Sequence, residues 1–216
     1  MIYKIKQTKT NFSMQWIVTQ GDNLICTVDA PYKGYYFDAN ITFSNNKQYR
    51  MYFNPHDTTY GKKLEDRLSF KIFDQNNNLI GNFVGRTKRT GKLFGGYLYY
   101  ELNISDTQYI GYEVGRGAEG IALCLYRDDK LLSICDKNTK IINFKDEYSI
   151  YCENEEDIYI STLFTIYYDM ARFANMQEIK LYSETDNYVV TFNKELKAKY
   201  DPEFIPRIKA IDGIVD

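Results

Sequence analysis

Short runs of alternating apolar and polar residues fill the first two thirds of the chain and predict a series of β-strands. The clearest runs form pairs around a polar turn, which is typical of antiparallel hairpins. Three such pairs lie at residues 39–43 and 49–53, 68–73 and 79–84, and 121–126 and 131–135. Further strands are expected at residues 16–18, 24–28, 97–102, 109–114, 141–144 and 148–152. Many short strands with no helix between them indicate an antiparallel sandwich or barrel.

After Cys152 the pattern changes to that of a helix. Asn154, followed by three acidic residues, is typical of an N-cap with acids in the first turn, and it predicts a helix over about residues 155–175. Apolar side chains point in nearly every direction around its axis, so the helix is expected to be buried. A narrow polar seam interrupts them at Ser161, Thr165, Asp169 and Arg172. Within it, Asp169 and Arg172 have the spacing of an i,i+3 ion pair.

A buried helix in a β-rich chain needs sheet on all sides. The most economical arrangement is a closed antiparallel β-barrel surrounding the helix, that is, a mainly β (α+β) fold over residues 1–176. A membrane-spanning helix is the alternative interpretation. The uncharged run before Asp169 is shorter than the ~20 residues that a bilayer requires, which argues against it.

Residues 177–216 form a C-terminal extension of different character. The pattern predicts a strand at 188–192, a short helix capped by Asn193, and a second helical start at Asp201 and Pro202 that Pro206 interrupts. One interpretation is that this extension packs on the barrel of its own chain. The other is that residues 193–216 dock on a protein partner or on a second copy.

Composition narrows the classes of function. The chain of 216 residues carries 27 Lys and Arg against 29 Asp and Glu, so a nucleic-acid partner is not expected. The N-terminal residues lack the apolar stretch of a signal peptide, so we expect a cytoplasmic protein, including one peripheral at a membrane. His56 is the one histidine, and Cys26, Cys124, Cys135 and Cys152 show no metal-ligand spacing. We therefore expect buried, reduced thiols, no metal, no cofactor and no enzymatic activity.

Four stretches carry a resemblance to a known family. They are the hairpin at residues 70–83, the hairpin at 123–134, the strand at 146–151, and the acidic cap of the apolar helix. Together they resemble the tubby C-terminal-like superfamily, which includes tubby domains, plant LURP-one-related proteins and phospholipid scramblases. The likeness is greatest to small bacterial members of unknown function, and it leaves the C-terminal extension without a counterpart. It implies a barrel around a hydrophobic helix and no shared catalytic set. Tubby domains bind phosphoinositide head groups through basic residues.

The densest basic cluster in the sequence is Arg86, Lys88 and Arg89, between Gly85 and Gly91, and Lys92 directly after Gly91, with Lys62 and Lys63 as further candidates. Arginine binds phosphate through a bidentate fork, so the cluster is a candidate anion site. The spacing of its glycines does not fit a phosphate loop, and Leu93 stands where the magnesium-binding hydroxyl is needed. The alternative is a solvated hairpin loop.

Two other motifs have the spacing of a known binding site but lack the context or the residues that the site requires. Gly115, Gly117 and Gly120 match the dinucleotide-binding spacing, but a strand rather than a helix follows them. Asp74, Asn76 and Asn78 match the start of a calcium loop, but the required Gly and the final Glu are missing. The leading hypothesis is therefore a non-enzymatic domain that binds anionic phospholipid head groups or a membrane surface through Arg86, Lys88, Arg89 and Lys92. The alternatives are a scaffold that uses its C-terminal tail and an unrecognised enzyme with a pocket at the barrel mouth.

Overall fold

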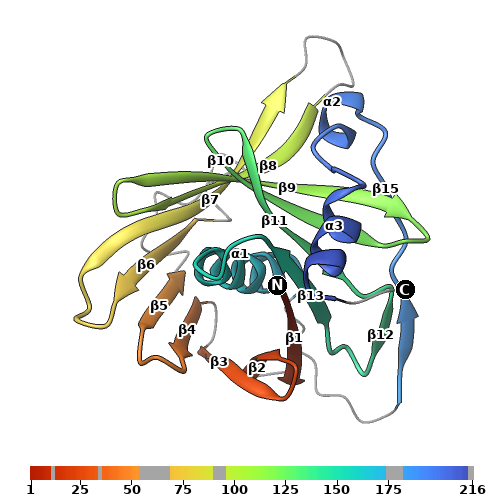
Figure 1. Ribbon diagram of the computed structural model, residues 1–216. Coiled ribbons are helices and arrows are strands. Elements are labelled where there is room, and N and C mark those ends of the chain that lie inside the picture. The colour runs from red at the N-terminus through yellow and green to blue at the C-terminus, as the bar shows by residue number, and fades with distance from the viewer. Residues whose placement is uncertain (11–12, 34–35, 54–68, 90–95, 174–181, 214–216) are drawn as a thin grey trace.

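The computed structural model describes residues 1–10, 13–33, 36–53, 69–89, 96–173 and 182–213. Twelve antiparallel strands close into one barrel, and a single long helix lies inside it (Figure 1). In chain order the barrel strands are β1 (Ile2–Lys9), β2 (Ser13–Gln20), β3 (Asn23–Lys33), β4 (Tyr36–Phe43), β5 (Gln48–Phe53), β6 (Phe70–Asp74), β7 (Leu79–Arg89), β8 (Gly96–Ile104), β9 (Thr107–Gly117), β10 (Ile121–Arg127), β11 (Lys130–Lys137) and β13 (Glu147–Cys152). The predicted fold class is confirmed.

The hydrogen-bonded strand order explains the closure. It runs β10-β11-β13-β1-β2-β3-β4-β5-β6-β7-β8-β9, and β9 pairs again with β10, for example Val114 with Ala122. The first strand of the chain therefore lies between the second and the last strand of the barrel, because β1 pairs with both β2 and β13. Closure pairs the strand edges that an open sheet would leave exposed.

Helix α1 (Asp157–Arg172) fills the barrel, and every residue from Ile160 to Met170 is buried. Its apolar side chains join those of the inward-facing barrel residues in one inner core. The predicted N-cap is misplaced. Glu156 occupies the cap position without a side-chain hydrogen bond, and the Asn154 amide donates instead to the Asp157 carboxylate at 2.9 Å. The burial of α1, rather than a strong cap, therefore stabilises its start.

Strand β1 was not predicted from the sequence. Its buried positions, Tyr3, Ile5 and Gln7, alternate with the exposed Lys4 and Lys6. The alternation is regular, but only two of the three inward residues are apolar, which made the signal weak. The strand is nevertheless central, since it joins the N-terminal half of the barrel to β13.

A second apolar layer lies on the outside of the barrel, and we call it the outer core. It consists of Tyr97, Val114, Ala122, Cys124, Ile134 and Tyr151 from the strands, with Leu196, Phe204 and Ile208 from the C-terminal extension. The extension supplies β15 (Val189–Val190), α2 (Lys194–Lys197) and α3 (Phe204–Ile211), and it runs along one side of the barrel in Figure 1. Strand β10 is therefore covered on both faces, which explains its unbroken run of five buried residues.

The prediction for Pro206 was wrong, because the proline lies inside α3 rather than ending it. It occupies the third helical position, where a backbone N–H would have no partner within the helix, so the missing donor costs nothing. The prediction for Asn193 is confirmed, since its side chain accepts a hydrogen bond from the Leu196 amide at 3.0 Å. A small separate sheet pairs β12 (Lys140–Ile142) with β14 (Glu184–Asp186).

Candidate functional site

Three of the sequence-predicted basic residues, Arg86, Lys88 and Arg89, lie on a strand rather than in a loop. Strand β7 continues through Arg89, with Arg86 opposite Tyr99 and Lys88 opposite Tyr97 in the ladder to β8. Arg86 and Lys88 therefore project from one face of β7, and Arg89 from the other. We call Arg86, Lys88 and Arg89 the basic end of β7. Lys92, Lys62 and Lys63 lie outside the described residues.

Two of these cations already have carboxylate partners. The Arg86 Nε atom donates to Glu101 Oε2 at 2.9 Å, and Lys88 forms an ion pair with Glu195 of α2. The hydrogen bond to Glu195 raises the pKa of Lys88, and the same bond lowers the pKa of Glu195. Arg89 is exposed. An external anion at Arg86 or Lys88 would thus compete with a carboxylate of the protein itself.

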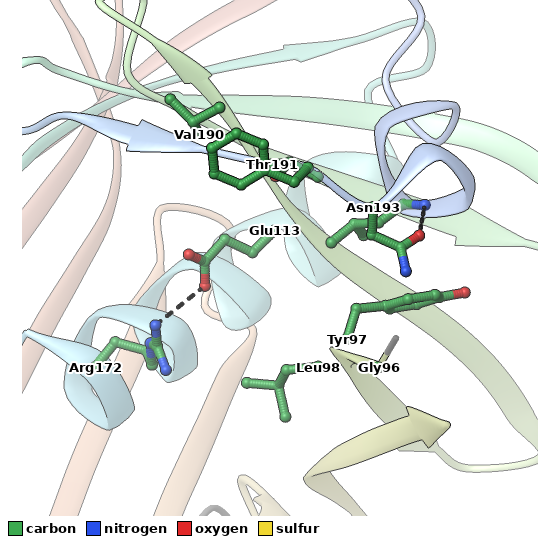
Figure 2. A pocket seen from close by; sticks show the side chains of 10 residues that line it. Gly96, Tyr97, Leu98, Glu113, Arg172, Val190, Thr191 and Asn193 are labelled. Atoms are coloured by element: carbon green, nitrogen blue, oxygen red, sulfur yellow. Dashed lines mark hydrogen bonds and ion pairs between the residues drawn. The ribbon is translucent and has the colours of Figure 1, made fainter. Parts of the chain in front are cut away.

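Beside the basic end of β7 lies a cavity of about 530 Å³, which we call the mouth cavity. Its walls come from the start of β8, from β9, from the last turn of α1 and from residues 190–196. Figure 2 shows Tyr97 and Leu98 on one side of it, Val190 and Thr191 on another, and Arg172 with Glu113 at one end. Glu195 connects the rim of the cavity to the basic end of β7. Its carboxylate pairs with Lys88 and also accepts a hydrogen bond from the Tyr97 hydroxyl at 3.0 Å.

The ion pair in the mouth cavity is not the predicted one. Arg172 lies 3.6 Å from Glu113 of β9 (Figure 2), whereas Asp169 points into the inner core. The Glu113 carboxylate also receives the hydroxyl of Tyr100 at 3.5 Å. Burial alone would lower the pKa of Arg172, but the charge of Glu113 opposes that effect and the pKa is raised, so the guanidinium stays charged. The i,i+3 spacing predicted the wrong ion pair, because Asp169 and Arg172 each bind a side chain of the barrel strands instead of one another.

Sequence reasoning missed a polar cluster inside the inner core. Asp169 accepts hydrogen bonds from Trp16 Nε1, at 3.0 Å, and from the hydroxyl of Tyr148. Lys137 of β11, which is also buried, pairs with Asp146. Burial lowers the pKa of Lys137 to about 8, and the Asp169 charge opposes that shift. An acid in the polar seam of an otherwise apolar helix was the one signal that could have suggested buried partners.

The remaining motifs have structural roles. Gly117 and Gly120 have positive φ angles in the β9–β10 turn, and Gly115 allows the Val189 backbone of β15 to approach, since a Cβ there would lie 2.5 Å from the Val189 carbonyl oxygen. Asp74 accepts the Asn76 and Asn78 amides within a tight turn. The four cysteines are buried and free, as predicted. His56 lies outside the described residues.

No protein-family model, curated protein or solved structure matches this chain. Within the part of the chain that the structure describes, no helix has the length and apolar character to cross a membrane. Nor do His, Cys, Asp and Glu side chains gather there in a group of three or more that could hold a metal ion. The assignment of a function therefore depends on the basic end of β7 and on the mouth cavity.

Proposed function

We propose that this protein is a non-enzymatic, tubby-like domain that binds anionic head groups at a membrane surface, in the cytoplasm and peripherally, through the basic end of β7. The observation that carries the proposal is the alignment of Arg86 and Lys88 on one face of β7, followed by the exposed Arg89. An antiparallel barrel around a hydrophobic helix is what the tubby resemblance implies, and this architecture supports the analogy with phosphoinositide binding. Lys92 belongs to the proposal by its place in the sequence.

The surroundings of these cations suit an interface with lipid. Tyr97 and Tyr99 stand opposite Lys88 and Arg86 on β8, and both rings pack within 6.4 Å of Tyr112 on β9. Tyrosine is favoured at the level of lipid head groups because it combines an apolar ring with a polar hydroxyl. Tyr97 is buried in the outer core, so the half-buried Tyr99 is the ring that would lie beside these cations at a membrane surface.

Two substitutions at and beside the basic end of β7 are expected to change vesicle binding in opposite directions. Arg89→Ala is expected to weaken co-sedimentation with phosphatidylserine-containing vesicles about fivefold, since one basic residue near an anionic surface contributes about 1 kcal/mol. Glu195→Gln is expected to strengthen binding, because it releases Lys88 from its internal partner. Lys9→Ala, an exposed lysine on β1 across the barrel, serves as the matched control and should leave binding unchanged.

Salt and vesicle composition complete the test. Electrostatic binding should fall as ionic strength rises, since the Debye length shortens from about 30 Å to about 8 Å between dilute and physiological salt. Vesicles of phosphatidylcholine alone should not sediment the protein, and phosphatidylinositol bisphosphate should bind better than phosphatidylserine at equal charge if the cations form a head-group site. Absence of binding at low salt, or equal binding by Arg89→Ala and wild type, would sink the proposal.

A further inference from the structure

The mouth cavity has the size and lining of a small-molecule site. Its volume of about 530 Å³ falls within the range of about 300–1,000 Å³ that is usual for ligand pockets. Such pockets combine a mostly apolar lining with a few polar groups that fix orientation. The lining of the mouth cavity is mixed, with one ion pair at one end, Thr191 and Asn193 as further polar groups, and apolar side chains between them.

The polar end presents a cation to the cavity. The Arg172 side chain is 41% exposed, whereas that of Glu113 is 15% exposed and receives the Tyr100 hydroxyl from the barrel interior. The distance of 3.6 Å between Arg172 and Glu113 is longer than a good hydrogen bond. A guanidinium carries five donors, so Arg172 can bind a further oxygen while it stays near Glu113. An anionic group is therefore the fitting polar partner.

The walls present apolar surface that the protein leaves uncovered. Leu98 and Leu196 line the cavity, together with Val190 and Phe192 of the C-terminal extension. Val190 is 39% exposed and Phe192 is 89% exposed, and they lie two residues apart in the C-terminal extension. Adjacent apolar side chains exposed at the rim of a cavity indicate a binding surface more strongly than a single exposed residue does.

We propose that the mouth cavity binds a single-chain amphiphile with an anionic head, a carboxylate or a phosphate monoester, whose head lies at Arg172 and whose chain covers Phe192. The site uses residues 190–196, which belong to the C-terminal extension. It is distinct from the basic end of β7, goes beyond the membrane-surface function and does not depend on it. A cationic amphiphile would meet the exposed guanidinium instead, and a neutral one would leave it without a new partner.

The test uses soluble probes and no vesicles, so it is independent of the vesicle assays. Decanoate and decyl phosphate, each below its micelle concentration, are titrated calorimetrically into the chain of residues 1–216, with decan-1-ol as the neutral probe of equal chain length. At least one anion is expected to bind about tenfold or more tightly than decan-1-ol, because a hydrogen bond between two charged groups is stronger than one to a neutral hydroxyl. The bound anion should also raise the melting temperature.

Two variants locate the probe. Phe192→Ser alters an almost fully exposed side chain, so it should leave folding intact and weaken binding of both anions. Leu79→Ser, a 61% exposed residue at the start of β7, is the matched control and should bind as wild type does. The double variant Arg172→Gln/Glu113→Gln removes both charges of the pair without leaving one unpaired, and it should abolish the preference for anions over the alcohol.

Three results would overturn the proposal. They are the absence of heat and of a melting shift with both anions, binding of decan-1-ol by the wild type that is as tight as that of both anions, and unchanged binding by Phe192→Ser. The last comparison holds even if the double variant fails to fold, because it does not involve the ion pair. Tighter binding of decanoate or of decyl phosphate identifies the preferred head group.

Discussion

Asp169 is the residue at which the polar contacts of the inner core converge. Its carboxylate accepts from Trp16 and Tyr148 and attracts the charge of Lys137, all within a region closed to water. Asp169→Asn removes the charge and one acceptor, and leaves buried donors without full partners. We expect it to lower the free energy of unfolding by about 1.5–3 kcal/mol, which is the usual contribution of a hydrogen bond to a charged group. Urea unfolding followed by the fluorescence of Trp16 measures this, and Asp106→Asn in an exposed turn is the control. A loss below that of the control would contradict the assigned role.

Lys137 gives the inner core a specific dependence on pH. Burial lowers the pKa of its ammonium to about 8 from 10.5. Between these values the unfolded chain holds a proton that the folded protein has released, so this group makes the free energy of unfolding rise with pH across that window. Below the window the lysine is charged in both states and only its desolvation cost remains. NMR of the lysine ε-carbons should show one residue titrating near pH 8, and Asp169→Asn should move that pKa lower still. Titration of every lysine above pH 10 would exclude the effect.

At the scale of elements, the packing of α1 against the barrel wall depends on one glycine, which has no side chain. Gly111 of β9 faces Phe164 of α1, and a Cβ at Gly111 would lie 2.3 Å from the ring. Gly111→Ala should therefore force the helix or the strand to shift, at a cost of about 1–3 kcal/mol. Gly111→Ala/Phe164→Leu should recover part of that loss, because the smaller side chain makes room. Melting temperatures of the two variants decide the matter, and a further loss in the double variant would show that the contact is not the cause.

The elements could be predicted where the signal is local. Residues 121–135 form the predicted hairpin because Asp128 and Asp129 accept positive φ angles, of 49° and 61°, in its tight turn. The barrel could be predicted because the apolar pattern of α1 indicates a buried helix, and a buried helix in a β-rich chain needs sheet around it. The candidate site followed only in part, since the basic residues were recognised but their partners were not. Glu195 lies 107 residues from Lys88, and the mouth cavity joins β8, β9, α1 and the extension. Contacts between such distant segments depend on the closed topology and leave no periodicity in the sequence.

At the scale of the whole molecule, the barrel wall separates two apolar layers, and the cysteines report on each. Cys26, Cys135 and Cys152 belong to the inner core, whereas Cys124 lies in the outer core beneath the C-terminal extension. Burial raises the pKa of the Cys124 thiol to about 12, so the thiolate that reacts with alkylating reagents is almost absent at neutral pH. In the wild-type protein, with the barrel folded and the extension packed on it, none of the four thiols should react.

Phe204 of α3 is fully buried in that outer layer, and Ile211 of the same helix is 67% exposed. Phe204→Ala should remove about 3–5 kcal/mol of packing, and the loss falls on the contact between the extension and the barrel. If the extension opens locally while the barrel stays closed, Cys124 alone becomes accessible, and iodoacetamide should label one thiol per chain. Ile211→Ala is the matched control and should label none. Peptide mapping identifies the thiol. Labelling of Cys26, Cys135 and Cys152 at the same rate as Cys124 would mean that the two layers unfold together, and that the extension is part of a single cooperative unit with the barrel.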